Sequence, residues 1–212
     1  MRALPLLAIC LLGCPRDPSD GIVVTGQLGG EAFDPATVVF DQYGAAPDDS
    51  AEPELQQLML VLADAPDACP LLGPLFHLGW LRCESACSGL LAEQALWPAG
   101  ELRVLWIGLT ADQDIEAAYT LARSDGPGSF TASYRRVDLS CLEGLDQDAC
   151  FAACTEDYAF LVTDQGLASV GDLEIRGYSS QLLEGELDLL FSQGDVQARF
   201  EAPACEMGLH GP

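Results

Sequence analysis

The sequence predicts a mainly β protein, an antiparallel β-sandwich or a small barrel with one or two short helices in its long connections. From Gly21 onward, apolar and polar residues mostly alternate with a period of two, which is typical of strands buried on one face. In the C-terminal third such segments recur roughly every ten to twelve residues between turn residues, which is the spacing of strands in sandwiches and barrels. A chain of 212 residues suffices for one domain with a sizeable core.

The N-terminal two thirds of the chain contain six strand candidates bounded by turn residues or acidic loops. Residues 101–110 carry apolar side chains on both faces, so this strand is predicted to lie near the centre of the sheet. The turn Asp125-Gly-Pro-Gly128 separates the last two candidates. The expected strands are 22–28, 37–43, 55–64, 101–110, 118–123 and 129–137.

The C-terminal third alternates most regularly. Leu173 and Ile175 alternate with charged residues, and the same pattern returns twice before the chain ends. The last two of these strands are joined by Ser192-Gln-Gly-Asp195, a hairpin signal.

Two segments depart from the period of two. Residues 69–97 are rich in Leu but interrupted by Gly and Pro, which predicts one or two short helices. Residues 145–158 predict a single short helix. Asp146 or Asp148 would lie near its N-terminus, where a carboxylate favours the helix dipole.

The first residues have the pattern of a lipoprotein signal peptide. Arg2 precedes an apolar run too short to span a bilayer, which takes about 20 apolar residues. Leu11-Leu12-Gly13-Cys14 then matches a lipobox, in which a diacylglycerol is attached to the Cys thiol and the chain is cut before that Cys. Cys10 is a poorer acceptor because Ile9 precedes it, and an ordinary signal peptide is the alternative. The predicted organisation is a signal peptide over 1–13, a lipidated tether over 14–20 and one β-sandwich domain over 21–212.

A lipidated Cys14 predicts a protein of the cell envelope. Pro15 follows this Cys where an Asp would resemble an inner-membrane retention signal, so the outer membrane is favoured. No later segment has the length and apolarity of a transmembrane helix. The membrane is therefore expected to be a partner through the acyl chains, and stable anchoring takes more than one chain.

The charge balance excludes one class of function. The chain has 33 acidic and 9 basic residues, all of the latter Arg, and a net charge of −24. Nucleic-acid binding depends on clustered Lys and Arg, so no nucleic-acid partner is expected. His77 and His210 are the only histidines, which leaves little material for acid–base chemistry near neutral pH. No cofactor motif is present, so none is expected, and the protein or small-molecule partner is left open.

Three stretches together resemble a known group of proteins. They are the lipobox, the segment Thr25-Gly-Gln-Leu-Gly-Gly-Glu-Ala-Phe33, and the C-terminal block that ends in Phe200-Glu-Ala-Pro-Ala-Cys205. In these the chain is similar to uncharacterised lipoproteins of myxobacteria and their relatives, which end in a Gly-Asp hairpin and a Phe-x-Ala-Pro-x-Cys close. The Cys-x-x-x-Cys motifs described next depart from that pattern. The resemblance implies a lipid anchor and a terminal β-hairpin, and it implies no activity, cofactor or catalytic residue.

Seven cysteines follow Cys14, so at least one of them stays free or pairs with another chain. An exported protein lies in an oxidising compartment, which favours disulfides over thiols. The candidates for disulfide formation are Cys69, Cys83, Cys87, Cys141, Cys150, Cys154 and Cys205.

Four of these cysteines form twin motifs, Cys83-Glu-Ser-Ala-Cys87 and Cys150-Phe-Ala-Ala-Cys154. On a helix, residues four apart share one face but have poor geometry for bridging each other. Two antiparallel helices could instead be joined twice, Cys83 to Cys154 and Cys87 to Cys150. The alternative is chemical, because four thiolates could ligate zinc, or one Cys-x-x-x-Cys pair could bind copper or exchange disulfides. Acidic neighbours such as Glu84 and Asp148 disfavour thiolates, so the structural interpretation is preferred.

Other residues invite weaker hypotheses. Carboxylates at alternate positions (Asp112, Asp114, Glu116) and in one acidic loop (Asp48, Asp49, Glu52, Glu54) suggest cation binding, but solvated loops explain them better. His77 is expected to be an ordinary partly buried His. Four aromatic residues could line a ligand groove but are expected in the core: Trp80, Trp97, Trp106 and Tyr178.

The sequence thus predicts a lipid-anchored, non-enzymatic structural or interaction module of the envelope. The alternative is a periplasmic thiol-redox or metal-binding protein that uses the twin motifs. A hydrolase with an unrecognised site is a third hypothesis, which would need a carboxylate pair in a pocket.

Overall fold

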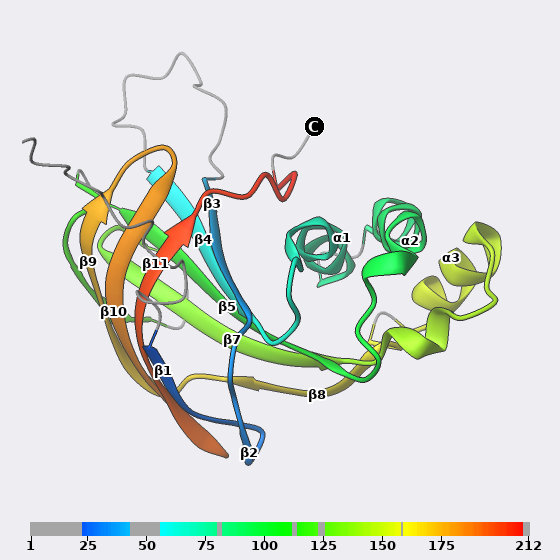
Figure 1. Ribbon diagram of the computed structural model, residues 1–212, viewed down its shortest axis with the longest axis horizontal. Helices are drawn as coiled ribbons and strands as arrows, with labels where there is room; N and C mark the ends of the chain where they lie inside the picture. The colour runs from blue at the N-terminus through cyan, green and yellow to red at the C-terminus, as the bar shows by residue number, and fades with distance from the viewer. Residues whose placement is uncertain are drawn as a thin grey trace, which may run out of the picture.

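The computed structural model describes residues 23–42, 56–79, 82–111, 114–122, 126–157 and 159–209. It confirms a mainly β fold with short helices, drawn in Figure 1 as a strongly curled sheet with three helices on one side. The predicted signal peptide, Cys14 and the tether lie outside the described residues. Within the described part, no helix is long and apolar enough to cross a membrane.

Every strand that the sequence predicted in the first two thirds is present, with ends shifted by at most two residues. The strands are β1 (Val23–Leu28), β2 (Glu31–Ala32), β3 (Thr37–Gln42), β4 (Gln56–Ala63), β5 (Leu102–Ala111), β6 (Ala118–Leu121), β7 (Ser129–Val137), β8 (Val162–Leu167), β9 (Val170–Tyr178), β10 (Leu182–Phe191) and β11 (Gly194–Pro203). The helices are α1 (Cys69–Gly79), α2 (Cys83–Ala92) and α3 (Gln147–Glu156), with 3₁₀ turns at Gln94–Leu96 and Leu139–Leu142.

The strands form one continuous sheet rather than two separate ones. Its order is β2-β1-β11-β10-β9-β6-β7-β5-β4-β3, with β8 paired to β7 off this path. The neighbours are antiparallel except β6 and β7, which run parallel. The sheet curls until β3, at one end of this order, reaches the segment that follows β11, where the Cys205 amide donates to the Phe40 carbonyl at 2.8 Å. The small barrel therefore describes the fold more closely than the sandwich.

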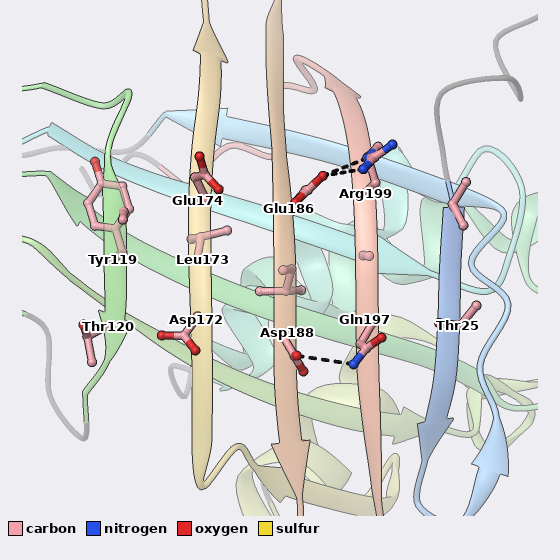
Figure 2. Close-up of a pocket in the computed structure, with 14 residues that line it drawn as sticks. Thr25, Tyr119, Thr120, Asp172, Leu173, Glu174, Glu186, Asp188, Gln197 and Arg199 are labelled. Carbon is pink, nitrogen blue, oxygen red and sulfur yellow. Dashed lines mark hydrogen bonds and ion pairs between the residues drawn. The ribbon is translucent and has the colours of Figure 1, made fainter.

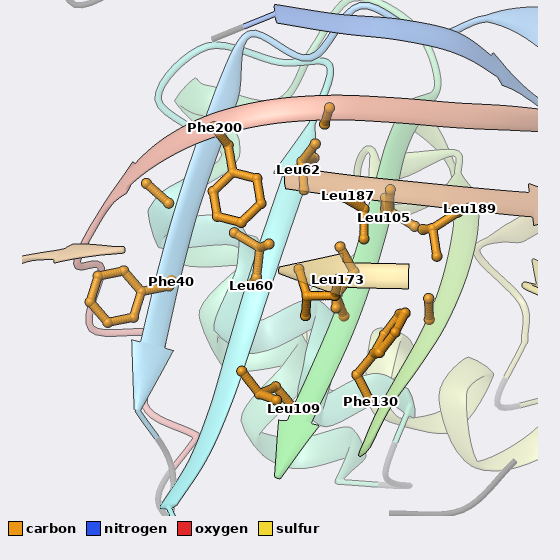
Figure 3. Close-up of a cluster of buried hydrophobic side chains, with 14 of the residues drawn as sticks. Phe40, Leu60, Leu62, Leu105, Leu109, Phe130, Leu173, Leu187, Leu189 and Phe200 are labelled. Atoms are coloured by element: carbon orange, nitrogen blue, oxygen red, sulfur yellow. The ribbon is translucent and has the colours of Figure 1, made fainter. Parts of the chain in front are cut away.

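The inner face of the curled sheet encloses the first of two cores. Figure 3 shows Leu173, Leu187 and Leu189 of β9 and β10 opposite Leu60, Leu62 and Leu105 of β4 and β5. Large rings complete this core: Phe40, Phe130 and Phe200, each at most 2% exposed. Burying a side chain of this size stabilises the fold by about 1.5–3 kcal/mol.

The second core lies between the outer face of β4 and β5 and the helices. Val61 and Val104 point to this side, where they pack with Leu71 of α1 and Leu90 of α2. The strand predicted over 101–110 is β5, and it is apolar on both faces because the inner core covers one face and the helices cover the other. It lies third from the β3 end of the strand order rather than at its centre. The helices pack closely, since a Cβ at Gly89 would overlap the ring of Pro74.

Candidate functional site

The twin cysteine motifs form the double cross-link that antiparallel helices allow. Cys83 of α2 pairs with Cys154 of α3, and Cys87 pairs with Cys150, with Cα–Cα separations of 5.7 and 5.9 Å. All four residues are buried. A zinc site would require these sulfurs as thiolates, so the chemical alternative needs both cross-links to be reduced.

Helix α3 depends on these cross-links more than on its own amphipathicity. Its buried residues are Cys150 and Cys154, and Phe151 between them is 45% exposed. The Asp146 side chain caps the helix by accepting from the Ala149 amide at 2.9 Å, as the sequence predicted for an Asp near this N-terminus. A helix of ten residues with so small an apolar face is marginal alone, so the staples hold it against α2.

The remaining cysteines divide into a third cross-link and a free thiol. Cys69, at the start of α1, pairs with Cys205, which follows β11 and lies 136 positions along the chain. This pairing was not predicted from the sequence, because disulfide connectivity does not follow from the spacing of cysteines. Cys141 is the free cysteine among the described residues, and it is exposed in the turn Leu139–Leu142.

A polar surface covers the outward face of β6, β9, β10, β11 and β1, which we call the polar face. The register aligns its side chains in two rows across the strands (Figure 2). One row runs Val23, Arg199, Glu186, Glu174, Ala118, and the other runs Thr25, Gln197, Asp188, Asp172, Thr120. The face is hollowed into a shallow trough of about 750 Å³.

The charged residues of the first row are paired with one another and with Arg176 of β9. Glu186 accepts from both nitrogens of the Arg176 fork at 2.6 and 2.7 Å and from Arg199 Nε at 2.8 Å. These bonds, with Arg199 first, lower the pKa of the Glu186 carboxyl below its usual value. Arg176 also reaches Glu174 at 3.1 Å. The pairs are solvent-exposed, so they order the surface more than they stabilise the fold.

The second row carries unbalanced negative charge. Asp172 lies directly opposite Asp188 on the neighbouring strand. Asp188 accepts a hydrogen bond from Gln197 at 3.3 Å, whereas Asp172 makes no side-chain hydrogen bond or ion pair with any described residue. Like charges directly opposite each other destabilise a sheet. This part of the trough therefore favours cationic or hydrogen-bond-donating groups of a partner.

A second charged cluster lies on the inward side of the sheet, at one end of the barrel. Arg103 Nε bonds the Asp64 carboxylate at 2.6 Å, and a second oxygen of that carboxylate accepts from the Arg103 amide at 2.8 Å. Arg136, directly opposite on β7, lies 3.2 Å from Glu31 and 3.5 Å from Glu101. These charge pairs lie at the end of the inner core, beyond its last apolar side chains. Sequence reasoning missed it, because the partners come from four separate segments.

The other residues singled out in the sequence do not converge on one site. His77 lies on α1, and partial burial, then the charge of Arg82, lowers its pKa. The Asp114 carboxylate accepts from the Glu116 amide at 3.0 Å, which forms a local turn. In the described residues, no three His, Cys, Asp or Glu side chains are grouped as a metal ion would require.

Of the aromatic residues expected in the core, Trp106 is buried, and Trp97 and Tyr178 are partly buried and pack against the two cores. Trp106 packs against Phe76 in the outer core, and Trp97 Nε1 donates to the Leu90 carbonyl at 3.1 Å. Tyr178 packs edge-on against Phe40 in the inner core. Several sequence candidates lie outside the described residues: Asp48, Asp49, Glu52, Glu54, Trp80, Asp112 and His210.

Comparison with known proteins gives no further assignment. No protein-family model, no curated protein and no solved structure matches the chain.

Proposed function

We propose that the chain is a lipid-anchored protein of the cell envelope that acts as a non-enzymatic interaction module. The observation that carries this proposal is the set of three disulfides. They join segments 63, 71 and 136 positions apart, and two of them hold α3 in place. Disulfides of this kind form and persist in oxidising compartments outside the cytoplasm.

The lipobox gives the proposal its membrane attachment. Cys14 is followed by eight residues before β1 begins at Val23. A segment of this length spans at most roughly 30 Å when extended, so the barrel would lie close to the bilayer surface. The net charge of −24 opposes direct contact with anionic lipids, which leaves the acyl chains to hold the protein there.

The polar face supports an interaction role. It is an open trough across five strands, with its charges paired along one row and left unbalanced along the other. Catalysis generally uses a site that excludes water around the reacting groups. An open face with hydrogen-bonding groups in register suits contact with another macromolecule.

Fatty-acid labelling of cells that express the full chain tests the anchor. The wild-type protein and the control Cys10→Ala should incorporate a labelled fatty acid and fractionate with membranes, and Cys14→Ala should do neither. Labelling that survives Cys14→Ala, or a wild-type protein without label, would contradict the proposal.

A further inference from the structure

A groove runs along the seam where the two ends of the curled sheet fail to pair. We call it the seam groove; it lies between Val23–Val24 of β1 and Thr37–Val39 of β3 and has a volume of about 1030 Å³. Its lining includes Pro35, Pro66 and Pro203. Among the described residues, the bridge from Phe40 to Ala204, which follows β11, joins β3 to that side of the sheet near the top of Figure 1, and the groove lies beside Thr37–Val39, which precede this bridge.

Both walls of the seam groove present the edge of a strand. β1 pairs with β11 along one edge. Its other edge pairs with β2 at Gln27 and Leu28 and accepts from the Phe33 amide at the Gly26 carbonyl, which leaves Val23–Thr25 open among the described residues. β3 pairs with β4 along one edge, and the bridge at Phe40 is the pairing of its other edge among the described residues. Such edges are templates for an added strand.

The lining of the groove is apolar with an acidic rim. Val23 lines the groove with a side chain that is 59% exposed. The charged residues of the lining are Asp34, Asp67 and Glu201, and no basic residue lines it. The groove therefore combines an apolar floor, open backbone edges and uniform negative charge.

Two of the chain's own segments, the predicted tether and the segment between β3 and β4, fit this groove poorly. The tether contains Pro15 and Pro18, which lack the amide that a strand donates. The segment between β3 and β4 contains four carboxylates and two prolines, so the acidic rim repels it. A second copy of the chain brings the same net charge of −24.

We propose that the seam groove binds an extended segment of a basic partner protein, added as a strand beside β1. The segment has an apolar centre that places about three residues beside Val23–Thr25, the open part of β1, at roughly 3.3 Å per residue, and it carries Lys or Arg on both sides. The proposal rests on the proposed role as an interaction module. It does not depend on the lipid anchor.

A set of matched peptides tests the proposal on the full-length, detergent-solubilised protein. The probe has the sequence Lys-Lys-Val-Thr-Val-Thr-Val-Lys-Lys, and two controls have Glu flanks or a central Pro. Fluorescence anisotropy should show the probe binding at least about ten-fold more tightly than either control, because one loses the charge match and the other the strand hydrogen bonds. Hydrogen exchange should show new protection of the amides along Val23–Thr25 and Thr37–Val39.

Two lysine substitutions supply a matched pair of variants. Val23→Lys places a positive charge at the mouth of the groove and should weaken probe binding about ten-fold. Val170→Lys changes a residue of the same type and exposure, 60%, outside the groove, and should leave binding unchanged. Asp67→Asn removes one rim charge, and Asn tolerates the positive φ of 54° at this position, so it should weaken binding without unfolding the protein.

Three outcomes would overturn the proposal. They are no binding of the probe, equal binding of the Pro-containing peptide, and equal loss in Val23→Lys and Val170→Lys, which would indicate nonspecific charge attraction. The intact mass of the same preparation reports the lipid on Cys14 separately. Failed binding by a correctly lipidated protein would therefore refute the groove and leave the anchor standing.

Discussion

The two cross-links between α2 and α3 are nested, so their contributions to stability should not be additive. The cycle that tests this replaces Cys83 and Cys154 by Ala in one variant, Cys87 and Cys150 in a second, and all four in a third. Each variant removes whole disulfides and leaves no unpaired thiol behind. Cys141→Ala is the matched control, because that cysteine is exposed and free.

The loop lengths give the expected magnitudes. The inner bridge closes a loop of 63 positions and the outer bridge one of 71, which by chain entropy is worth about 4.3 kcal/mol for whichever bridge forms first. Once one bridge exists, the other closes only a ring of roughly eight to ten residues, worth about 2.5 kcal/mol. Removing either bridge should therefore lower the free energy of unfolding by about 2.5 kcal/mol, and removing both by about 7 kcal/mol.

Chemical denaturation without reductant measures these differences. The double removal should exceed the sum of the single removals by about 2 kcal/mol, and Cys141→Ala should change stability by less than about 0.5 kcal/mol. A loss of about 4 kcal/mol for each bridge alone would show that the bridges act independently. No loss of stability on removal of either bridge would show that α3 is held by packing. Either of these two results would refute the nested account.

Three further predictions follow from particular residues. Gly26→Ala should lower the free energy of unfolding by about 1–3 kcal/mol, because Gly26 has a φ of 145° and an added Cβ would overlap the Asp195 carbonyl. The control Gly30→Ala, at a φ of 79° with open space around it, should lower it by less in the same denaturation assay. Asp172→Asn should raise the midpoint of denaturation by relieving the repulsion with Asp188, with a larger gain at low salt than at high salt, and an equal gain at both would contradict the charge explanation. Burial raises the pKa of Tyr119 to about 12, so the folded state favours the neutral phenol. The free energy of unfolding should therefore fall as pH rises from about 10 to about 12. A Tyr119→Phe protein with the same fall would refute this assignment.

Sequence patterns predicted the strands that face the inner core, because burial on one face imposes the period of two that those strands display. Strand β8 escaped prediction for the same reason. Its residues alternate between exposed and half-buried and it pairs with β7 alone, so Val162–Leu167 contains little apolar signal. The parallel pairing of β6 with β7 was also missed, since register between strands depends on the path of the whole chain.

The cysteine sites show the same division between local and long-range information. Spacing within the twin motifs restricted the pairing of four cysteines, because residues four apart on one helix lie on one face. Cys69 and Cys205 have no such local partner, so only the folded chain brings them together. The sequence did not predict the polar face, because the residues of its two rows come from five strands that only the fold aligns.

The intact mass of the membrane-extracted protein, alkylated without reduction, tests the central claim most directly. A lipid-anchored, disulfide-stapled protein should begin at a lipidated Cys14 and carry one alkylated thiol, at Cys141. An unprocessed chain would carry three alkylated thiols, because Cys10 and Cys14 would remain free. That result, or four further alkylated cysteines from the twin motifs, would contradict the account.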